Sequence, residues 1–158
     1  MASERIHPEV KERRPTWDEY FMKIASAVSE RATCPKRSVG AVIAKDNRLI
    51  SAGYNGSPRG TPHCDDVGCY EEDGHCKRVI HAELNAIIQV AFQGGASTDG
   101  GTIYTTDFPC NDCAKFIIAA GIQRVVYSRD YHDPETSFAM ELFKGKGIEV
   151  VRFKETNH

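Results

Sequence analysis

The sequence has no apolar run long enough to span a bilayer, and residues 1–8 carry charge without an apolar signal core. It also has no excess of positive charge, because 20 lysines and arginines against 22 aspartates and glutamates give a formal net charge of −2. A nearly neutral protein has no global field that recruits nucleic acid. These absences predict a cytoplasmic protein with no membrane partner and no stable nucleic-acid partner.

Internal repeats and low-complexity segments are absent as well, which excludes repeat arrays and compositionally disordered proteins. The 158 residues, 41% hydrophobic and 27% charged, fit one globular domain with a full core. Residues 1–15 are polar, with prolines at positions 8 and 15, and are typical of a flexible arm. We therefore expect a single domain over residues 16–158.

The hydrophobic pattern predicts helices and strands that alternate along the chain. Thr16 and Glu19 fit a capping box at the start of an amphipathic helix. Its apolar stripe, which we expect in the core, consists of Trp17, Tyr20, Phe21, Ile24, Ala25 and Val28. The pattern then predicts a hairpin over 39–53, a loop to 79, helices over 81–92, 110–120 and 135–146, and strands over 102–106, 124–128 and 148–153.

In the helix over 81–92, one apolar stripe consists of Leu84, Ile87, Ile88 and Ala91, which places His81 at a helix N-terminus. Strands that alternate with helices favour an α/β fold in which a sheet is covered on both faces. Right-handed crossovers would make the later strands parallel.

One histidine and two cysteines have the residue types and spacing of a zinc site. His81 and Glu83 open one predicted helix, and Cys110 and Cys113 lie one turn apart at the start of another. One imidazole nitrogen and two thiolates are ligands that zinc takes tetrahedrally, and a fourth position left open for water is the pattern of a catalytic site. Glu83 lies beside the metal without being needed as a ligand, so it can act as the proton shuttle.

Each half of this pattern has an ordinary explanation when it is taken alone. A His-x-Glu on a helix usually consists of ordinary surface or core residues with no role in metal binding. A Cys-x-x-Cys can be a redox pair or half of a structural zinc site. The two halves in this order, with Pro109 before the first cysteine and an apolar helical run after each, favour the catalytic zinc interpretation.

These motifs resemble those of the zinc-dependent deaminases, whose signature is H-x-E followed by P-C-x-x-C. Three longer runs resemble the deoxycytidylate (dCMP) deaminase family in particular: Gly53-Tyr54-Asn55-Gly56-Ser57-Pro58, His81-Ala82-Glu83-Leu84-Asn85-Ala86-Ile87 and Phe108-Pro109-Cys110-Asn111-Asp112-Cys113-Ala114-Lys115. The resemblance extends from about Trp17 to about Phe153. It implies a three-layer α/β/α sandwich with a mixed five-stranded sheet and two helix N-termini at the metal.

The implied activity is hydrolytic deamination of dCMP to dUMP and ammonia by zinc-bound hydroxide, with Glu83 as the catalytic acid and base. This reaction would supply dUMP for thymidylate synthesis. The resemblance also implies a homo-oligomer, with a hexamer favoured, activation by dCTP with Mg²⁺, and inhibition by dTTP. Alternatives are deamination of dCTP, free cytosine or a tRNA adenosine, and a non-catalytic nucleotide-binding or DNA-uptake accessory role.

The resemblance suggests two contacts with the substrate. Asn55 would bind a sugar hydroxyl, although an asparagine in a turn is an equal alternative. Tyr131 would contact the nucleotide, although a partly buried aromatic is an equal alternative. Arg59 and Arg78 are cationic candidates for the phosphate, but surface arginines are common and both stay outside the predicted site.

Four cysteines remain outside the catalytic motif: Cys34, Cys64, Cys69 and Cys76. Three of them cluster before His81, between His63 and the catalytic helix, which suggests a second, structural zinc. Cys34 and Cys64 match positions used for such a zinc in some dCMP deaminases, whereas His75 or His63 is an alternative fourth ligand. Free thiols are the remaining alternative.

Overall fold

The computed structural model describes residues 13–155, so the expected flexible arm over residues 1–15 lies almost entirely outside the described residues. The centre is a mixed sheet of five strands in the order β2-β1-β5-β6-β7. The strands are β1 (Gly40–Lys45), β2 (Arg48–Tyr54), β5 (Thr102–Asp107), β6 (Arg124–Arg129) and β7 (Glu149–Arg152). Strand β1 pairs antiparallel with β2 and β5, and β5, β6 and β7 are parallel to one another, with a helix in each of the two connections between them.

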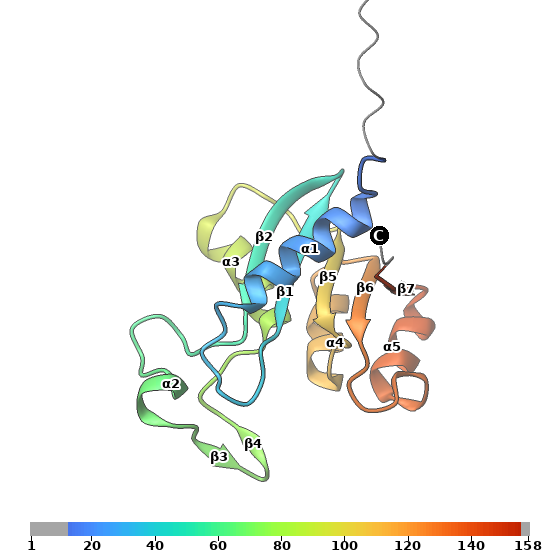
Figure 1. Cartoon of the computed structure of the whole chain (residues 1–158). Helices are drawn as coiled ribbons and strands as arrows, with labels where there is room; N and C mark the ends of the chain where they lie inside the picture. The colour runs from blue at the N-terminus through green and yellow to red at the C-terminus, as the bar shows by residue number, and fades with distance from the viewer. Residues whose placement is uncertain (1–12, 156–158) are drawn as a thin grey trace, which may run out of the picture.

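Helices cover both faces of this sheet (Figure 1). Helix α1 (Trp17–Ser29) packs on one face, and α3 (Ala82–Gln93), α4 (Asn111–Ala119) and α5 (Phe138–Lys146) pack on the other, with a short 3₁₀ helix, η1 (Pro134–Thr136), before α5. Alternate strand residues divide between the two cores, since Val42 and Tyr104 pack with α1 while Ile43 and Ile103 pack with the other helices. The predicted three-layer α/β/α sandwich is therefore confirmed. None of the helices described is both long and apolar enough to cross a membrane.

Helix α1 begins where its capping residues predict. The Thr16 hydroxyl accepts a hydrogen bond from the Glu19 N–H at 3.2 Å. The predicted core stripe is only partly correct, because Trp17 and Tyr20 are 53% and 46% exposed and lie against the ring of Phe21 rather than the sheet. Met22, outside the predicted stripe, is buried in their place.

The segment predicted as a loop before His81 contains regular structure. It forms a helical turn, α2 (Cys64–Val67), and a hairpin of β3 (Glu71–Glu72) and β4 (His75–Cys76). Asp73 and Gly74 close the hairpin with φ of +52° and +76°, the backbone of a type I′ turn. Two-residue strands are too short for periodicity to reveal. These elements extend beyond one end of the main sheet (Figure 1).

Helix α3 packs very closely on strand β2, and the apolar stripe seen in the sequence is not its most buried face. Ala82, Glu83, Ala86 and Val90 are buried, whereas Ile88 is 40% exposed and Ala91 is exposed. The contact point is Gly53, where an added Cβ would lie 2.4 Å from the Ala86 nitrogen and 2.6 Å from the Ala82 oxygen. This approach admits only small residues at the point of contact, while Ile87 packs partly buried against the same core.

Candidate active site

The first turns of α3 and α4 bring three metal-binding side chains together. His81 is the N-cap residue of α3, Cys110 is the N-cap residue of α4, and Cys113 lies in the first turn of α4. The His81 Nδ1 atom lies 3.4 Å from Cys110 Sγ and 3.5 Å from Cys113 Sγ. The three ligand atoms all lie within 4.8 Å of one another.

This geometry fits a zinc ion. Tetrahedral bonds of about 2.0–2.1 Å to nitrogen and about 2.3 Å to sulfur would place those two ligand atoms about 3.6 Å apart. The observed spacings of 3.4 and 3.5 Å agree with that value. Because the chain offers three ligands here, a fourth position remains for a reacting molecule, and His81, Cys110 and Cys113 would hold a catalytic rather than a structural ion.

The electrostatics of the cluster also favour a cation. Hydrogen bonds from the Cys113 thiol and the His81 ring lower the pKa of Cys110 to about 4, although burial opposes the shift. The hydrogen bond to Cys110 and burial raise the pKa of Cys113, so the metal-free cluster holds one thiolate and one thiol. The Cys110 thiolate is also the main cause of the raised pKa of His81. A dication would favour the thiolate form of both cysteines.

Glu83 is buried beside this cluster, with 4% of its surface exposed. Burial raises the pKa of its carboxyl group above the ordinary value of 4.5, which makes the group a better proton carrier than an exposed glutamate. Its Oε1 atom lies 3.0 Å from the Thr105 hydroxyl. A buried carboxyl group with this position and pKa can carry protons to and from a molecule bound at the metal.

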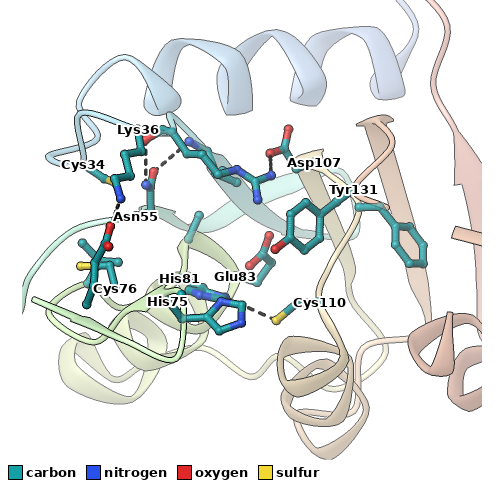
Figure 2. A pocket seen from close by; sticks show the side chains of 17 residues that line it. Cys34, Lys36, Asn55, His75, Cys76, His81, Glu83, Asp107, Cys110 and Tyr131 are labelled. Atoms are coloured by element: carbon teal, nitrogen blue, oxygen red, sulfur yellow. Dashed lines mark hydrogen bonds and ion pairs between the residues drawn. The ribbon is translucent and has the colours of Figure 1, made fainter. Parts of the chain in front are cut away.

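A cavity of about 210 Å³ opens onto His81, Glu83 and Cys110, and it is also lined by Asn55 and Tyr131 (Figure 2). Asn55 has a second role that links two loops, because its Oδ1 accepts from the Val39 N–H at 2.8 Å and its Nδ2 donates to the Arg37 carbonyl at 2.9 Å. The structure thus brings both predicted substrate contacts to the cavity that holds the metal cluster.

Four charged residues in the cavity wall escaped the sequence analysis: Lys36, Arg37, Glu71 and Asp107. Arg37 forms an ion pair with Asp107, and its guanidinium carbon lies 4.1 Å from the centre of the Tyr131 ring. Arg59 and Arg78 lie elsewhere: Arg59 stacks on Phe92, and Arg78 donates to the Gly68 carbonyl. A Lys-Arg pair in a polar loop carries no sequence signal that would have singled it out.

Three of the remaining cysteines form a second cluster. The sulfur atoms of Cys64, Cys69 and Cys76 lie within 4.8 Å of one another, and those of Cys64 and Cys76 are 3.6 Å apart. Cys34 lies outside this group but lines the active-site cavity, as do Cys76 and His75. His63 is the N-cap residue of α2, and its Nδ1 lies 3.3 Å from the Thr33 hydroxyl.

A three-layer sandwich that joins a His-Cys-Cys cluster to a buried glutamate is the arrangement of the zinc-dependent deaminases. Residues 15–129 match the family profile of the cytidine and deoxycytidylate deaminase zinc-binding region. The chain therefore belongs to the cytidine and deoxycytidylate deaminase family. The match confirms the family predicted from the sequence motifs.

Individual relatives agree with this assignment. The chain is 48% identical over 137 residues to ComE operon protein 2 of Bacillus subtilis, which covers 87% of this chain and 71% of that protein. It is 38% identical over 149 residues to the deoxycytidylate deaminase of Saccharomyces cerevisiae, covering 90% of this chain but only 46% of the yeast protein's length. The crystal structure of dCMP deaminase from the cyanophage S-TIM5 with dCMP and dUMP superposes with a TM-score of 0.76 at 32% identity, over 90% of this chain and all of that one.

Proposed function

We propose that this protein is a zinc-dependent hydrolase that deaminates dCMP to dUMP and ammonia. The observation that carries the proposal is the pairing of the His81, Cys110 and Cys113 ligand cluster with the buried carboxyl group of Glu83 in one cavity. The likeness to a dCMP deaminase crystallised with dCMP and dUMP supports this choice of substrate. The product would supply dUMP for thymidylate synthesis. Residues 16–158 would act as one deaminase domain. The six cysteines form no disulfides, which agrees with the proposed location in the reducing cytoplasm.

Zinc held by the three ligands would supply an activated water at neutral pH. Glu83 takes the proton of that water and places it on N3 of the cytosine ring, so that C4 accepts the oxygen without leaving negative charge on a ring nitrogen. The same carboxyl group then carries the second proton to the amino group on C4, which departs as ammonia. Burial serves this role, because a raised pKa lets Glu83 hold each proton between the two transfers.

The test is an absorbance assay of the zinc-loaded protein with cytidine, deoxycytidine, CMP, dCMP and dCTP. We expect dCMP to be the preferred substrate, and Glu83→Gln to keep its zinc while turnover falls by about 10³-fold or more. Zinc content measured on the same samples is the control. Wild-type turnover in a zinc-loaded Glu83→Gln protein would show that another group moves the protons.

Two other functions compete with dCMP deamination. Preference for dCTP in the same assay would identify a triphosphate deaminase. A non-catalytic role in nucleotide binding or DNA uptake is suggested by the 48% identity to a protein named for the comE operon. The buried Glu83 and its contact with Thr105 argue for catalysis, because a binding protein needs no proton shuttle. No turnover of any cytosine nucleotide would favour the accessory role.

We also propose a structural zinc held by Cys64, Cys69 and Cys76, with Cys34 as the predicted fourth ligand and His75 or His63 as alternatives. The 3.6 Å between Cys64 and Cys76 supports this site, because two sulfurs on tetrahedral zinc lie about 3.8 Å apart. Although burial opposes the shift, backbone N–H groups of Arg78 and Val79 lower the pKa of Cys76 to about 7 and favour the thiolate that binds zinc.

We further propose that dCTP with Mg²⁺ activates the enzyme and that dTTP inhibits it. We also propose a homo-oligomer, with a hexamer favoured. The support for regulation is the likeness of the run from Gly53 to Pro58 to the regulatory segment of the family. Apart from Asn55, which lines the active-site cavity, that run lines a second cavity of about 480 Å³ whose lining holds none of the three metal ligands. Adding either effector to the dCMP assay tests regulation, and light scattering gives the number of subunits. Unchanged rates with both effectors would contradict regulation.

A further inference from the structure

Helices α4 and α5 lie side by side on one face of the sheet, and α5 contacts the segment that carries the cysteine ligands at two points (Figure 1). The ring of Phe143 lies edge-on to the ring of Phe108, with their centres 6.2 Å apart. The backbone N–H of Ala139 donates to Asn111 Oδ1 at 3.0 Å. Ala139 and Phe143 are four residues apart, so both contacts come from one face of α5. Phe108 and Asn111 lie on either side of Cys110, so α5 contacts the ligand segment before and after this residue.

The chain that leads into Cys110 is fixed by packing. Phe108 is 2% exposed, and its ring also lies against Tyr127 of β6, with their centres 4.9 Å apart. The Phe108 N–H donates to the Arg129 carbonyl at 2.8 Å, which joins the same residue to the end of β6. Pro109 is fully buried, and its ring restricts the backbone angle φ. The backbone therefore reaches Cys110 in a fixed position.

The chain that leaves Cys110 is held by the side chain of Asn111. Asn111 is the first residue of α4 and lies between the two cysteine ligands. The Ala139 N–H that it accepts belongs to the first turn of α5, where backbone donors have no carbonyl partner within their own helix. The next donor of that turn, the Met140 N–H, is accepted at 3.1 Å by Ser137, the N-cap residue of α5. The first turn of α5 is therefore capped by one residue of its own and by one residue of the metal-binding turn.

This hydrogen bond between α4 and α5 has a consequence for the metal site. Asn111 is exposed and is not among the residues that line the active-site cavity, so its effect on the reaction is indirect. If its oxygen were removed, water could satisfy the Ala139 N–H, but water does not connect the two helices. The first turn of α4 would then be fixed on the Phe108 side alone. The spacings of 3.4 and 3.5 Å from His81 Nδ1 to the two sulfurs, which fit zinc, depend on the position of this turn.

We propose that Asn111 is a positioning residue of the zinc site. By joining the first turn of α4 to α5, it holds both cysteine sulfurs at the spacing that zinc requires, although none of the three ligands comes from α5. Partners that orient metal ligands commonly contribute about 10- to 100-fold to metal affinity or activity. This inference rests on the zinc site of the proposed function and adds α5 to the elements that maintain it.

The test measures how fast zinc passes from the protein to a coloured chelator. All variants are made in Cys69→Ser protein, the parent, so that an ion in the second cluster does not contribute. We expect Asn111→Ala to release zinc about 10-fold faster than the parent, and Asn111→Asp, which keeps an acceptor oxygen, to release it at close to the parent rate. Ser137→Ala is the matched control, because it removes the neighbouring first-turn hydrogen bond of α5 without changing α4. It should also keep the parent rate, and thermal unfolding of both alanine variants measures their loss of stability.

Steady-state kinetics with dCMP gives a second readout. With limiting zinc we expect Asn111→Ala to lose kcat and to regain it when zinc is added, while KM stays within about 2-fold of the parent value because Asn111 does not line the cavity. Zinc release at the parent rate from Asn111→Ala, or equally fast release from Ser137→Ala, would overturn the proposal, since Asn111 would then only stabilise α5. Zinc release requires no turnover, so it decides the proposal even if no cytosine nucleotide is deaminated. A parent protein that binds no zinc would overturn both this proposal and the proposed function.

Discussion

The hydroxyl of Thr105 lies between two oxygen atoms and has one proton to give. It is 3.0 Å from Glu83 Oε1 and 2.9 Å from the Asp107 backbone carbonyl, which can only accept. When Glu83 is ionised, the hydroxyl donates to it. When Glu83 is protonated, Glu83 donates to the hydroxyl, which then donates to the carbonyl. Thr105 can therefore hold the carboxyl group in place through both states of the proposed shuttle.

We predict that Thr105→Val lowers kcat for dCMP by about 10-fold with little change in KM, because the carboxyl group loses its orienting hydrogen bond. Thr105→Ser keeps the hydroxyl and should restore most of kcat. Steady-state kinetics at fixed zinc content measures both. A wild-type kcat in the Thr105→Val variant would show that Thr105 contributes only to packing and does not orient Glu83.

At the same scale, the zinc ligands could be predicted from the sequence, but the charged residues that line the cavity, such as Arg37 and Asp107, could not. His81 and Glu83 are two residues apart, and Cys110 and Cys113 are three apart, so local spacing alone places each pair at a helix start. Arg37 and Asp107 are 70 residues apart and meet only because β1 pairs with β5. Nothing local marks a residue whose partner is chosen by sheet register.

At the scale of elements, one carboxylate fastens α1 to the sheet. Asp18 in the first turn of α1 accepts from Arg124 of β6 at 2.7 and 2.8 Å and from the Tyr104 hydroxyl of β5 at 2.8 Å. The hydrogen bonds from Arg124 are the largest cause of the lowered pKa of Asp18, and burial opposes them. Because the folded pKa lies below the ordinary value of 3.8, the stabilisation is present above that pH and is lost as the pH falls through the folded pKa.

We predict that Asp18→Asn lowers the free energy of unfolding at pH 7 by about 1 kcal/mol, since the pair is partly exposed. The difference from wild type should shrink as the pH falls below 3.8 toward the lower folded pKa of Asp18. Urea unfolding at several pH values measures it. Glu149→Gln is the control, because Glu149 pairs with the same arginine from an exposed position. An equal loss in that variant would show that general charge, rather than the Asp18 network, stabilises the sheet.

Elements also show where hydrophobic periodicity fails. It predicted the existence of α3, α4 and α5, but it did not show which residues of α3 would be the most buried. The close approach at Gly53 decides this, because Ala82 and Ala86 fit against β2 and are fully buried, whereas Ile88 is exposed. Periodicity measures how hydrophobic a face is, whereas the distance between a helix and a sheet depends on which strand lies beneath it.

At the scale of the whole molecule, the two cysteine-containing clusters are joined through the cavity wall. The β3–β4 hairpin carries Cys76 of the second cluster, and its residues Glu71, Gly74 and His75 line the active-site cavity. A metal that fixes this hairpin would therefore also fix one side of the substrate pocket, although it takes no part in the chemistry.

We predict two zinc ions per chain by elemental analysis, falling to one in Cys69→Ser, with a raised KM for dCMP and a smaller effect on kcat. Cys64→Ser should give the same zinc count, but Cys64 is buried and its variant needs a thermal unfolding control. One zinc per wild-type chain, unchanged in Cys69→Ser, would leave the second cluster as free thiols.

Gly53 lies in β2 and is not among the residues that line the active-site cavity, yet it fixes how closely the catalytic helix α3 packs on the sheet. His81 and Glu83 belong to the same first turn, so any side chain at position 53 would lift the metal ligand and the proton carrier together. A substitution at position 53, outside the cavity lining, would therefore look like a defect in metal affinity. The missing side chain of Gly53 thus keeps His81 and Glu83 of α3 at the right distance from the cysteine ligands of α4.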